Sequence, residues 1–378
     1  MLTLNRITTP LKKGVVFTIL VRYPLLGVFS LFVLSTYSCN TTDSQNALYN
    51  EIGFDWKDFK KQELLSSDFI IFDEILKPHQ IIDQGGYLIV SSLTSDWGLF
   101  VIEKSTMKIV KKMAKIGDGP DEVSDVWQLD KGFDDQTVWT FSFTNKEFSE
   151  FSISSGDQNP LRKIKITEAG YQSLSANWIN ENAWIGYQNI GASRFAVFDT
   201  LMQKKKSVGL WPSSSNGDPL PDNKTFILSR LNQGYTALSP DRKTLIHSNI
   251  KTDAFEIIDL NSGKITKVIG PIMQELEYTL SGSGASLGVI VDENMKNGYN
   301  HTSITKEKIF LCFLGNSYQE RREKGIMSEN IFVFDFKGVP LINYKLDRSI
   351  KALSVNENER KIYALTYEEE PGLAIFHY

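Results

Sequence analysis

Residues 238–245 read Leu-Ser-Pro-Asp-Arg-Lys-Thr-Leu, a short turn between two apolar positions. Proline presets φ inside such a turn, and the aspartate side chain accepts hydrogen bonds from the turn backbone. A second turn follows at 259–265, Asp-Leu-Asn-Ser-Gly-Lys-Ile, in which Gly263 is free to adopt a positive φ. The segment between the two turns is rich in apolar residues. The pattern predicts consecutive antiparallel strands joined by hairpins.

The same order of four short strands recurs from residue 69 to the end of the chain. Six units of about 45–60 residues fit this order, and that period is typical of the blades of a β-propeller. The sixth unit begins at Ile350 and ends one strand short. The fifth unit is expected to contain strands at 287–291, 309–314, 330–336 and 340–346.

The strand that the sixth unit lacks has a candidate at the start of the body. Phe69–Ile75 reads Phe-Ile-Ile-Phe-Asp-Glu-Ile and precedes the first unit. If it pairs as the outer strand of the sixth unit, it removes an open sheet edge and closes the ring. The predicted fold is therefore all-β, a six-bladed propeller with four-stranded blades closed by an N-terminal strand. Seven blades or a pair of β-sandwiches are the alternatives, and Asn50–Leu65 is either a helix or an extended segment.

One connection and the C-terminal strands resemble a known family. Lys115–Val123 reads Lys-Ile-Gly-Asp-Gly-Pro-Asp-Glu-Val and resembles the G-x-G-P-x-E connection of the TolB-like six-bladed propeller lipoproteins of Gram-negative anaerobes. Asp121 stands where glycine is usual. The resemblance covers residues 69–378 and implies the propeller fold, but it implies little about activity because the family is largely uncharacterised. The other segments similar to the family are 309–315, 331–340, 344–347 and 362–365.

The first 38 residues have the features of an export signal. Four basic residues and no acid precede Cys39, and the apolar stretch 24–34 is too short to span a bilayer. Ser35–Cys39 resembles a bacterial lipobox, in which the cysteine thiol is acylated and the chain is cut before it. Several acyl chains on one protein anchor it stably in a membrane, whereas a single chain binds only marginally. The predicted organisation is a signal peptide at 1–38, a lipidated tether and N-terminal segment at 39–66, and the propeller at 67–378.

Two other interpretations of the N-terminus remain open. Thr36 and Tyr37 depart from the usual lipobox residues. In one alternative, the segment from Gly14 to Leu34 is an uncleaved membrane anchor. A charged side chain such as Arg22 near the middle of the membrane would oppose its insertion by about 2.5–3.5 kcal/mol. A conventional signal peptide is the other. The predicted location is the cell envelope of a Gram-negative bacterium, as an outer-membrane lipoprotein that faces the periplasm or the cell surface.

Charge and cysteine content narrow the possible partners. The chain has 41 basic and 45 acidic residues, and the part from Cys39 onward keeps 37 of the basic ones, for a net charge of about −8. An acidic body argues against nucleic-acid binding, which normally needs a basic face. With Cys39 lipidated, Cys312 has no partner for a disulfide. A monomer that contacts the membrane through its lipid is expected.

Candidate ligand-binding residues follow from their places in the blades. Trp127 and Trp178 open their blades on the innermost strand, so they could face a central funnel and stack on a sugar or peptide. His79 lies beside Pro78 at the mouth of the first blade. The competing interpretation is packing between blades for the two tryptophans and a hydrogen-bonded structural histidine for His79. Arg321 and Arg322 lie in a charged insertion, 317–324, expected to be a solvated loop on one face of the propeller.

These features predict a non-enzymatic binding or scaffold module for a protein, peptide or glycan, without a cofactor, catalytic residue or metal. The alternative is a calcium-dependent hydrolase of the lactonase type, in which axial oxygen ligands hold the ion. Its candidate ligands are Glu122, Asn177, Asn232 and Asp292. Gly117–Pro120 could be taken for a phosphate-binding loop, but it lacks the Lys-Ser/Thr of a P-loop and is predicted to be a turn between blades.

Overall fold

The computed structural model describes residues 49–211, 222–283, 287–366 and 371–378. The predicted signal peptide and Cys39 lie outside the described residues. Strands form most of the fold, and no helix in the described ranges is long and apolar enough to cross a membrane. The helical segments are η1 (Trp56–Asp58), η2 (Glu168–Gln172), α2 (Asp222–Leu231) and α3 (Tyr318–Lys324).

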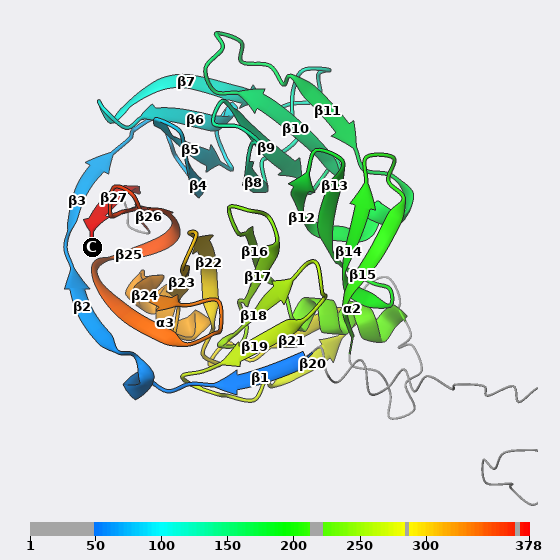
Figure 1. The fold of residues 1–378 in the computed structure, drawn as a ribbon, viewed down its shortest axis with the longest axis vertical. Helices are drawn as coiled ribbons and strands as arrows, with labels where there is room; N and C mark the ends of the chain where they lie inside the picture. Colours follow the sequence, from blue (N-terminus) through cyan, green and yellow to red (C-terminus); the bar gives the residue numbers. More distant parts are fainter. Residues whose placement is uncertain (1–48, 212–221, 284–286, 367–370) are drawn as a thin grey trace, which may run out of the picture. The chain divides into compact units, whose positions relative to one another are not determined.

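The first three blades are separate sheets of four antiparallel strands (Figure 1). Blade one contains β4 (Pro78–Gln84), β5 (Tyr87–Ser92), β6 (Trp97–Glu103) and β7 (Lys108–Lys115). Blade two contains β8 (Gln128–Lys131), β9 (Thr137–Ser142), β10 (Glu147–Ser152) and β11 (Arg162–Lys165). Blade three contains β12 (Ser173–Asn180), β13 (Ala183–Gln188), β14 (Ser193–Asp199) and β15 (Lys204–Leu210).

The last three blades take additional strands from the N-terminal segment. Blade four contains β16 (Gly234–Leu238), β17 (Thr244–Asn249), β18 (Ala254–Asp259) and β19 (Ile265–Ile269). Blade five contains β22 (Tyr299–Ile304), β23 (Ile309–Phe313), β24 (Ser328–Phe334) and the first half of β25 (Pro340–Asn356). Blade six contains the second half of β25, then β26 (Lys361–Thr366), β27 (Gly372–His377) and β3 (Ser67–Ile71).

The long strand β25 joins two blades into one continuous sheet. Its first half pairs with β24 as the outer strand of blade five, and its second half pairs with β26 as the inner strand of blade six. The six inner strands contact each other in the order β4, β8, β12, β16, β22 and β25, and β25 contacts β4. The ring therefore has six blades, as predicted, and not seven blades or a pair of sandwiches.

Residues 49–71, here called the N-terminal belt, run along the outside of blades four, five and six (Figure 1). β1 (Tyr49–Gly53) pairs in parallel with β19, and β2 (Lys61–Leu65) pairs in parallel with β25. β3 pairs antiparallel with β27 and closes the ring, which confirms the predicted closing strand. The strand covers Ser67–Ile71 instead of 69–75, because a turn follows in which the Ile75 N–H donates to the Phe72 carbonyl. Residues 50–65 are extended, apart from η1, and not an α-helix.

One apolar cluster fills each of the six contacts between neighbouring blades. The cluster between blades two and three includes Trp139, Trp178 and Trp184. The cluster between blades four and five includes Phe54 and Phe59 of the belt. Because the packing repeats around the ring, no single central core exists, and each blade is held by its two neighbours.

The predicted inner strand of blade five, 287–291, is wrong. Those residues fall at β21 (Gly288–Val291), which forms a separate hairpin with β20 (Tyr278–Ser281) between blades four and five. The true inner strand is β22, which reads Tyr-Asn-His-Thr-Ser-Ile. Its polar side chains face the channel and the neighbouring blades, so it lacks the apolar run that the sequence interpretation relied on.

Candidate functional site in the central channel

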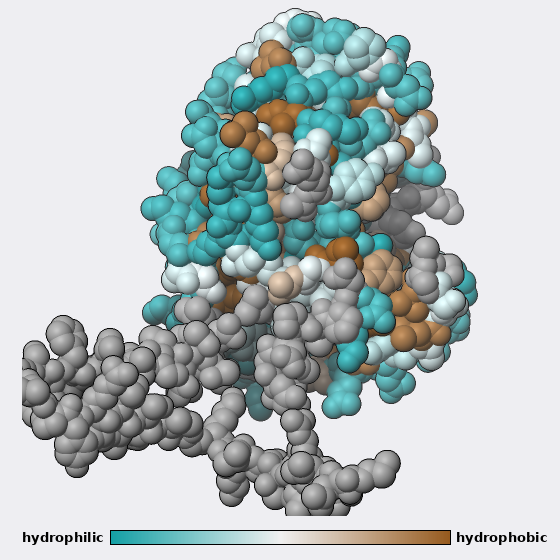
Figure 2. Space-filling model, turned by 90° about the vertical axis from the view of Figure 1, so that its right-hand side faces the viewer, coloured by the Kyte–Doolittle hydropathy of each residue, from teal (hydrophilic) through white to brown (hydrophobic). Residues whose placement is uncertain are grey.

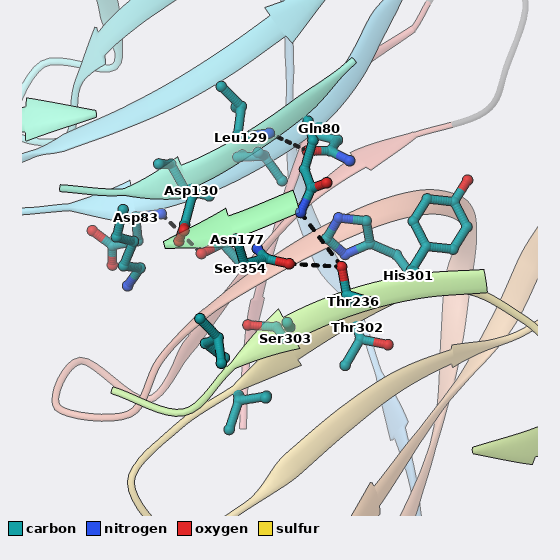
Figure 3. Close-up of a pocket in the computed structure, with 18 of the residues that line it drawn as sticks. Gln80, Asp83, Leu129, Asp130, Asn177, Thr236, His301, Thr302, Ser303 and Ser354 are labelled. Carbon is teal, nitrogen blue, oxygen red and sulfur yellow. Dashed lines mark hydrogen bonds between the residues drawn. The ribbon is translucent and has the colours of Figure 1, made fainter. Parts of the chain in front are cut away.

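A channel of about 940 Å³ lies among the inner strands of all six blades. Figure 3 shows Gln80, Asn177, Thr236 and His301 pointing into the same space from four different blades. The face at which each inner strand begins is called the entry face below. The opposite face, which carries the turns that follow the inner strands, is called the turn face.

A ring of side-chain to backbone hydrogen bonds surrounds the channel. Each inner strand pairs on one side only, so backbone N–H groups on its other side need partners. In most blades a side chain of one inner strand accepts a hydrogen bond from an N–H of the next inner strand around the ring. The pairs are Leu129 N to Gln80 Oε1 (2.7 Å), Ala176 N to Gln128 Oε1 (3.0 Å), Trp178 N to Asp130 Oδ2 (3.0 Å), Leu353 N to His301 Nδ1 (3.4 Å), Val355 N to Ser303 Oγ (3.2 Å) and Asp83 N to Ser354 Oγ (2.8 Å).

Two contacts between blades use side-chain pairs instead. The Thr236 hydroxyl donates to Asn177 Oδ1 at 2.8 Å between blades three and four. Ser248 and Thr302 hydroxyls lie 2.6 Å apart between blades four and five. A neutral hydrogen bond contributes roughly 0.5–1.5 kcal/mol net, so the ring of bonds adds stability and also orients the inner strands.

Arg242 connects three blades at the turn face. It lies in the turn between β16 and β17 with φ 56°, a left-handed conformation that usually suits glycine. Its guanidinium donates to Asp130 Oδ2 (3.3 Å), to the carbonyls of Lys131 (2.6 Å) and Gly132 (3.1 Å), and to the carbonyl of Trp178. These bonds offset the backbone strain and join blade four to blades two and three along the channel wall.

The entry face presents an indole ring supported by an imidazole. His79 Nε2 lies 3.1 Å from the Trp127 carbonyl, so Nε2 carries the proton and donates, which leaves Nδ1 as an acceptor. The two rings lie 5.4 Å apart, and 40% of the Trp127 side chain is exposed. Burial lowers the pKa of His79 to about 4, although its bond to Trp127 acts in the opposite direction. His79 is therefore neutral near pH 7.

A second imidazole faces the channel from blade five. His301 Nδ1 accepts from the Leu353 N–H, so its other nitrogen, Nε2, carries the proton. The ring lies 5.8 Å from the ring of Tyr235, and burial lowers the pKa of His301 to about 3. The entry face thus offers one imidazole acceptor and one imidazole donor, both uncharged.

Charged groups gather at the turn face. Lys104 bonds Asp83 at 2.9 Å and Glu359 at 2.8 Å, which connects blade one to blade six at the closing seam. Lys131 lines the channel beside Asp130, and burial lowers its pKa. Burial raises the pKa of Asp130, against the opposing effect of Arg242. The two ends of the channel therefore differ: exposed aromatic rings and uncharged imidazoles line the entry end, whereas buried ion pairs line the turn end.

The structure separates the residues that the sequence had grouped as a funnel. His79 and Trp127 lie together on the channel wall. The prediction that Trp178 faces the funnel is wrong, because its side chain is 1% exposed and packs against Trp139 and Phe148 between blades. Side chains alternate along a strand, so Asn177 points toward blade four and Trp178 toward blade two.

Arg321 and Arg322 lie in α3, away from the channel lining. Residues 318–324 form a helix, not the expected loop, because Ser317 and Glu320 form a capping box. Arg321 donates to Asn297 Oδ1 at 2.5 Å and to the Asn316 carbonyl at 2.9 Å. Arg321 therefore fixes the helix to its own blade.

Several channel residues were missed by sequence reasoning. Gln80, Gln128, Asp130 and His301 act through backbone partners 48–52 residues away, one blade further along the chain. That spacing equals the blade period, so a search for polar residues in equivalent places of successive blades would have found most of them. Arg242 could have been noticed in the sequence because it is a bulky residue at a turn position where glycine is favoured.

The glycine-rich connection is a turn between blades one and two, as expected. The Glu122 carboxylate accepts from the Gly119 N–H at 2.9 Å and pairs with Lys115 at 2.6 Å. A Cβ at Gly117 would lie 2.0 Å from that carboxylate, so a larger residue there would displace the Glu122 side chain. The bond to Lys115 lowers the pKa of Glu122. The backbone of this loop thus binds the Glu122 carboxylate of the same loop, whereas the backbone of a phosphate-binding loop binds the phosphates of a nucleotide.

The four candidate calcium ligands do not converge. Asn177 lines the channel, whereas Glu122 is in the connection just described and Asn232 bonds the Leu228 carbonyl at the end of α2. Asp292 follows β21, where its carboxylate accepts from the Asn294 N–H. Within the described ranges, no three His, Cys, Asp or Glu side chains come together as a group that could hold a metal ion.

Comparison with protein families gives a match over most of the ring. The family model described as TolB-like 6-blade propeller-like matches residues 55–358. This chain belongs to that TolB-like propeller family. The family agrees with the six blades counted from the inner strands and with the resemblance of the glycine-rich connection. Comparison with curated proteins gives no match.

Two solved propeller structures are similar to this chain. A candidate exported protein from Bacteroides fragilis is 12% identical, with a TM-score of 0.51 over 86% of this chain and 99% of that chain. The β-propeller domain of Cps50 (Swd1) from Myceliophteria thermophila is 11% identical, with a TM-score of 0.46 over 83% of this chain and 99% of that chain. At 12% identity, the Bacteroides fragilis structure supports the propeller fold of this TolB-like chain and nothing more specific.

Proposed function

We propose that this TolB-like propeller is a lipid-anchored, non-enzymatic binding or scaffold module of the Gram-negative cell envelope. Its ligand, a protein, peptide or glycan, contacts the entry face of the channel. The observation that carries this proposal is the exposed indole of Trp127, held in place by His79 at the mouth of a cavity of about 940 Å³.

The mouth is preorganised for binding. The ring of hydrogen bonds orients the inner strands, and the His79 bond to the Trp127 carbonyl positions the indole before any ligand arrives. Preorganised groups lose little conformational entropy when a ligand binds, so more of the contact energy contributes to affinity. A concave site with aromatic walls and a few convergent polar groups is the usual form of a binding pocket.

The side of the ring offers less support for a binding surface. The face shown in Figure 2 is mainly hydrophilic, with apolar residues in small separate patches. Contiguous apolar patches on a surface mark interaction sites, whereas scattered apolar residues are ordinary. The side shown in Figure 2 thus offers no large apolar patch for a ligand, and the channel mouth is favoured over this side as the place of contact.

The anchor and the envelope location rest on the N-terminal sequence. Cys39 closes an apolar segment that has a basic, acid-free start. The similar Bacteroides fragilis structure, a candidate exported protein, is compatible with export. Mass spectrometry of the mature protein should find an acylated Cys39 as the first residue, and Cys39→Ser should release the protein from membranes. An unmodified Met1 terminus would refute the anchor.

Binding is tested by capture from envelope extract. Full-length protein in detergent should retain a ligand, and Trp127→Ala should lose most of it. The matched control is Tyr278→Ala, which removes an aromatic side chain that is 46% exposed and outside the channel lining. Equal capture by all three proteins would refute binding at the mouth. Loss of capture with a calcium chelator would favour the calcium-dependent alternative.

A further inference from the structure

The entry face carries an arc of cations and aromatic rings around the channel mouth. The aromatic members of this arc are in contact: the rings of His79 and Trp127 lie 5.4 Å apart, and those of Trp127 and Phe143 lie 5.9 Å apart. The ammonium of Lys146 lies 3.7 Å from the centre of the Phe143 ring. The members of this entry-face arc, in order, are Lys351, His79, Trp127, Phe143, Lys146, Arg230 and Lys251.

The cations of the arc have no carboxylate partners among the described side chains. Lys146 donates to the Ser173 carbonyl at 2.8 Å, and Lys251 donates to the Arg230 carbonyl at 2.7 Å, so both contact neutral groups. The nearby acid Asp125 is engaged by the Ser142 hydroxyl and by backbone N–H groups. Four positive groups thus gather on a protein whose net charge is negative.

The environment of these groups favours an added anion. Burial lowers the pKa of Lys351 to about 8, and burial together with Arg230 lowers that of Lys146 to about 8. Burial and Arg230 also lower the pKa of Lys251. An anionic group bound between these cations would compensate for the desolvation and for their mutual repulsion.

The neutral groups of the mouth suit hydroxyls. His79 presents an acceptor and His301 presents a donor, and a hydroxyl can satisfy both because it donates and accepts. The phosphodiester backbone of DNA has acceptors but no donor for His79 Nδ1. Flat exposed rings such as Trp127 and Phe143, which are 40% and 37% exposed, can stack on the apolar face of a sugar.

We infer that the entry-face arc binds an extended acidic saccharide. Sugar rings stack on Trp127 and Phe143, hydroxyls contact the imidazoles, and carboxylate or sulfate groups contact the arc cations. The arc runs from blade six through blades one and two to α2 and blade four, so a single monosaccharide would leave most of it empty. The inference rests on the proposed function, since it names the ligand class for the same mouth.

Isothermal titration of the full-length protein in detergent tests the inference. The probes are a polygalacturonate hexasaccharide, a heparin hexasaccharide, neutral maltohexaose and single-stranded dT. At least one acidic hexasaccharide should bind at least tenfold more tightly than maltohexaose and dT. The two acidic probes separate carboxylate from sulfate as the recognised group.

Variants locate the site. Trp127→Ala and the pair Lys351→Met with Lys251→Met should each weaken acidic saccharide binding about tenfold, and the lysine pair should also reduce its salt dependence. Trp127→Phe should recover part of the affinity. Lys264→Met removes an exposed cation from the turn face and should leave affinity unchanged. Thermal unfolding of each variant checks that the ring is intact.

Two results would overturn the inference. If dT binds as tightly as the acidic saccharides, the arc is a general polyanion site. If no saccharide binds while Trp127-dependent capture from envelope extract persists, the ligand class is wrong and the proposed binding function stands. If capture also proves independent of Trp127, both proposals fail together.

Discussion

The two halves of the ring are held together by different means. Blades one to three contain six tryptophans and are built only from their own four strands, and the blade two to three contact is a cluster of Trp139, Trp178 and Trp184. Blades four to six contain no tryptophan and take strands β1, β2 and β3 from the N-terminal belt. Their inner packing depends on phenylalanines, two of which, Phe54 and Phe59, belong to the belt.

This difference separates local from distant stabilisation. In the first half, each sheet consists of strands adjacent in sequence, so each strand pair forms by closing only a short loop. In the second half, the belt pairs with residues more than 200 positions away, for example Tyr49 with Ile265 and Leu65 with Leu346. Such contacts carry a larger loop-closure entropy and form only when the ring is nearly complete. The belt is therefore the part whose loss should matter most.

Deleting the belt, residues 49–71, should have the largest effect. The deletion exposes the outer edges of blades four, five and six and removes Phe54, Phe59 and Leu65 from two clusters. We expect loss of cooperative unfolding and rapid proteolysis, measured by circular dichroism and limited digestion. Leu64→Ser, at a belt side chain that is 72% exposed, is the control and should change little. A deletion variant that unfolds cooperatively within a few degrees of the parent would show that the halves are equivalent.

A single anchor of the belt should have the next largest effect. Phe54 makes edge contacts with Phe59, Phe332 and Phe334, so Phe54→Ala should lower the free energy of unfolding by about 3–5 kcal/mol. Trp56→Ala removes a side chain that is 39% exposed and should cost clearly less. Denaturant titration measures both. An equal cost for the two substitutions would mean that the belt lies loosely on the blades.

Acid should weaken both halves through one histidine in each. The pKa of His79 is lowered to about 4 and that of His301 to about 3, so the unfolded chain binds protons below about pH 6.5 while the folded protein does not. The free energy of unfolding should fall by about 2 kcal/mol per histidine between pH 6.5 and 4.5, and the contribution should level off below about pH 4 for His79 and below about pH 3 for His301. His79→Gln and His301→Asn place an uncharged amide where the imidazole was. Each substitution should remove the part of the acid-induced fall in the free energy of unfolding that its histidine causes. Unchanged pH profiles in both variants would contradict the neutral state of these rings.

Arg242→Gly should have the smallest effect. Glycine relieves the left-handed strain by about 1 kcal/mol, whereas loss of the charged bonds to blades two and three costs about 1.5–3 kcal/mol. The expected net loss is about 1 kcal/mol, measured by denaturant titration. Arg360→Gly, at another left-handed position in a blade turn (φ 53°), is the matched control and should be neutral or stabilising. A stabilised Arg242→Gly variant would show that the bridge between blades is dispensable.

The sequence by itself was enough for the architecture. Turn residues such as Ser239-Pro240-Asp241, apolar strand runs and their period predicted six blades and a closing strand, because these signals are local and repeat. The same logic failed at β22, whose polar sequence carries no apolar run, and placed the strand at 287–291 instead. The site was only partly predictable: His79 and Trp127 lie at the mouth, but Trp178 points between blades.

Only the tertiary structure decided which side chains meet. The register of each inner strand determines whether Asn177 or its neighbour Trp178 faces a given blade, and a shift of one residue would exchange them. The contact of Arg242 with Asp130 and the arc from Lys351 to Lys251 bring together residues up to 272 positions apart in the chain, and no local pattern encodes their distance in space. The sequence determined that a ring would form, through short-range strand and turn preferences. Closure of that ring then brought scattered lysines, rings and imidazoles to one mouth.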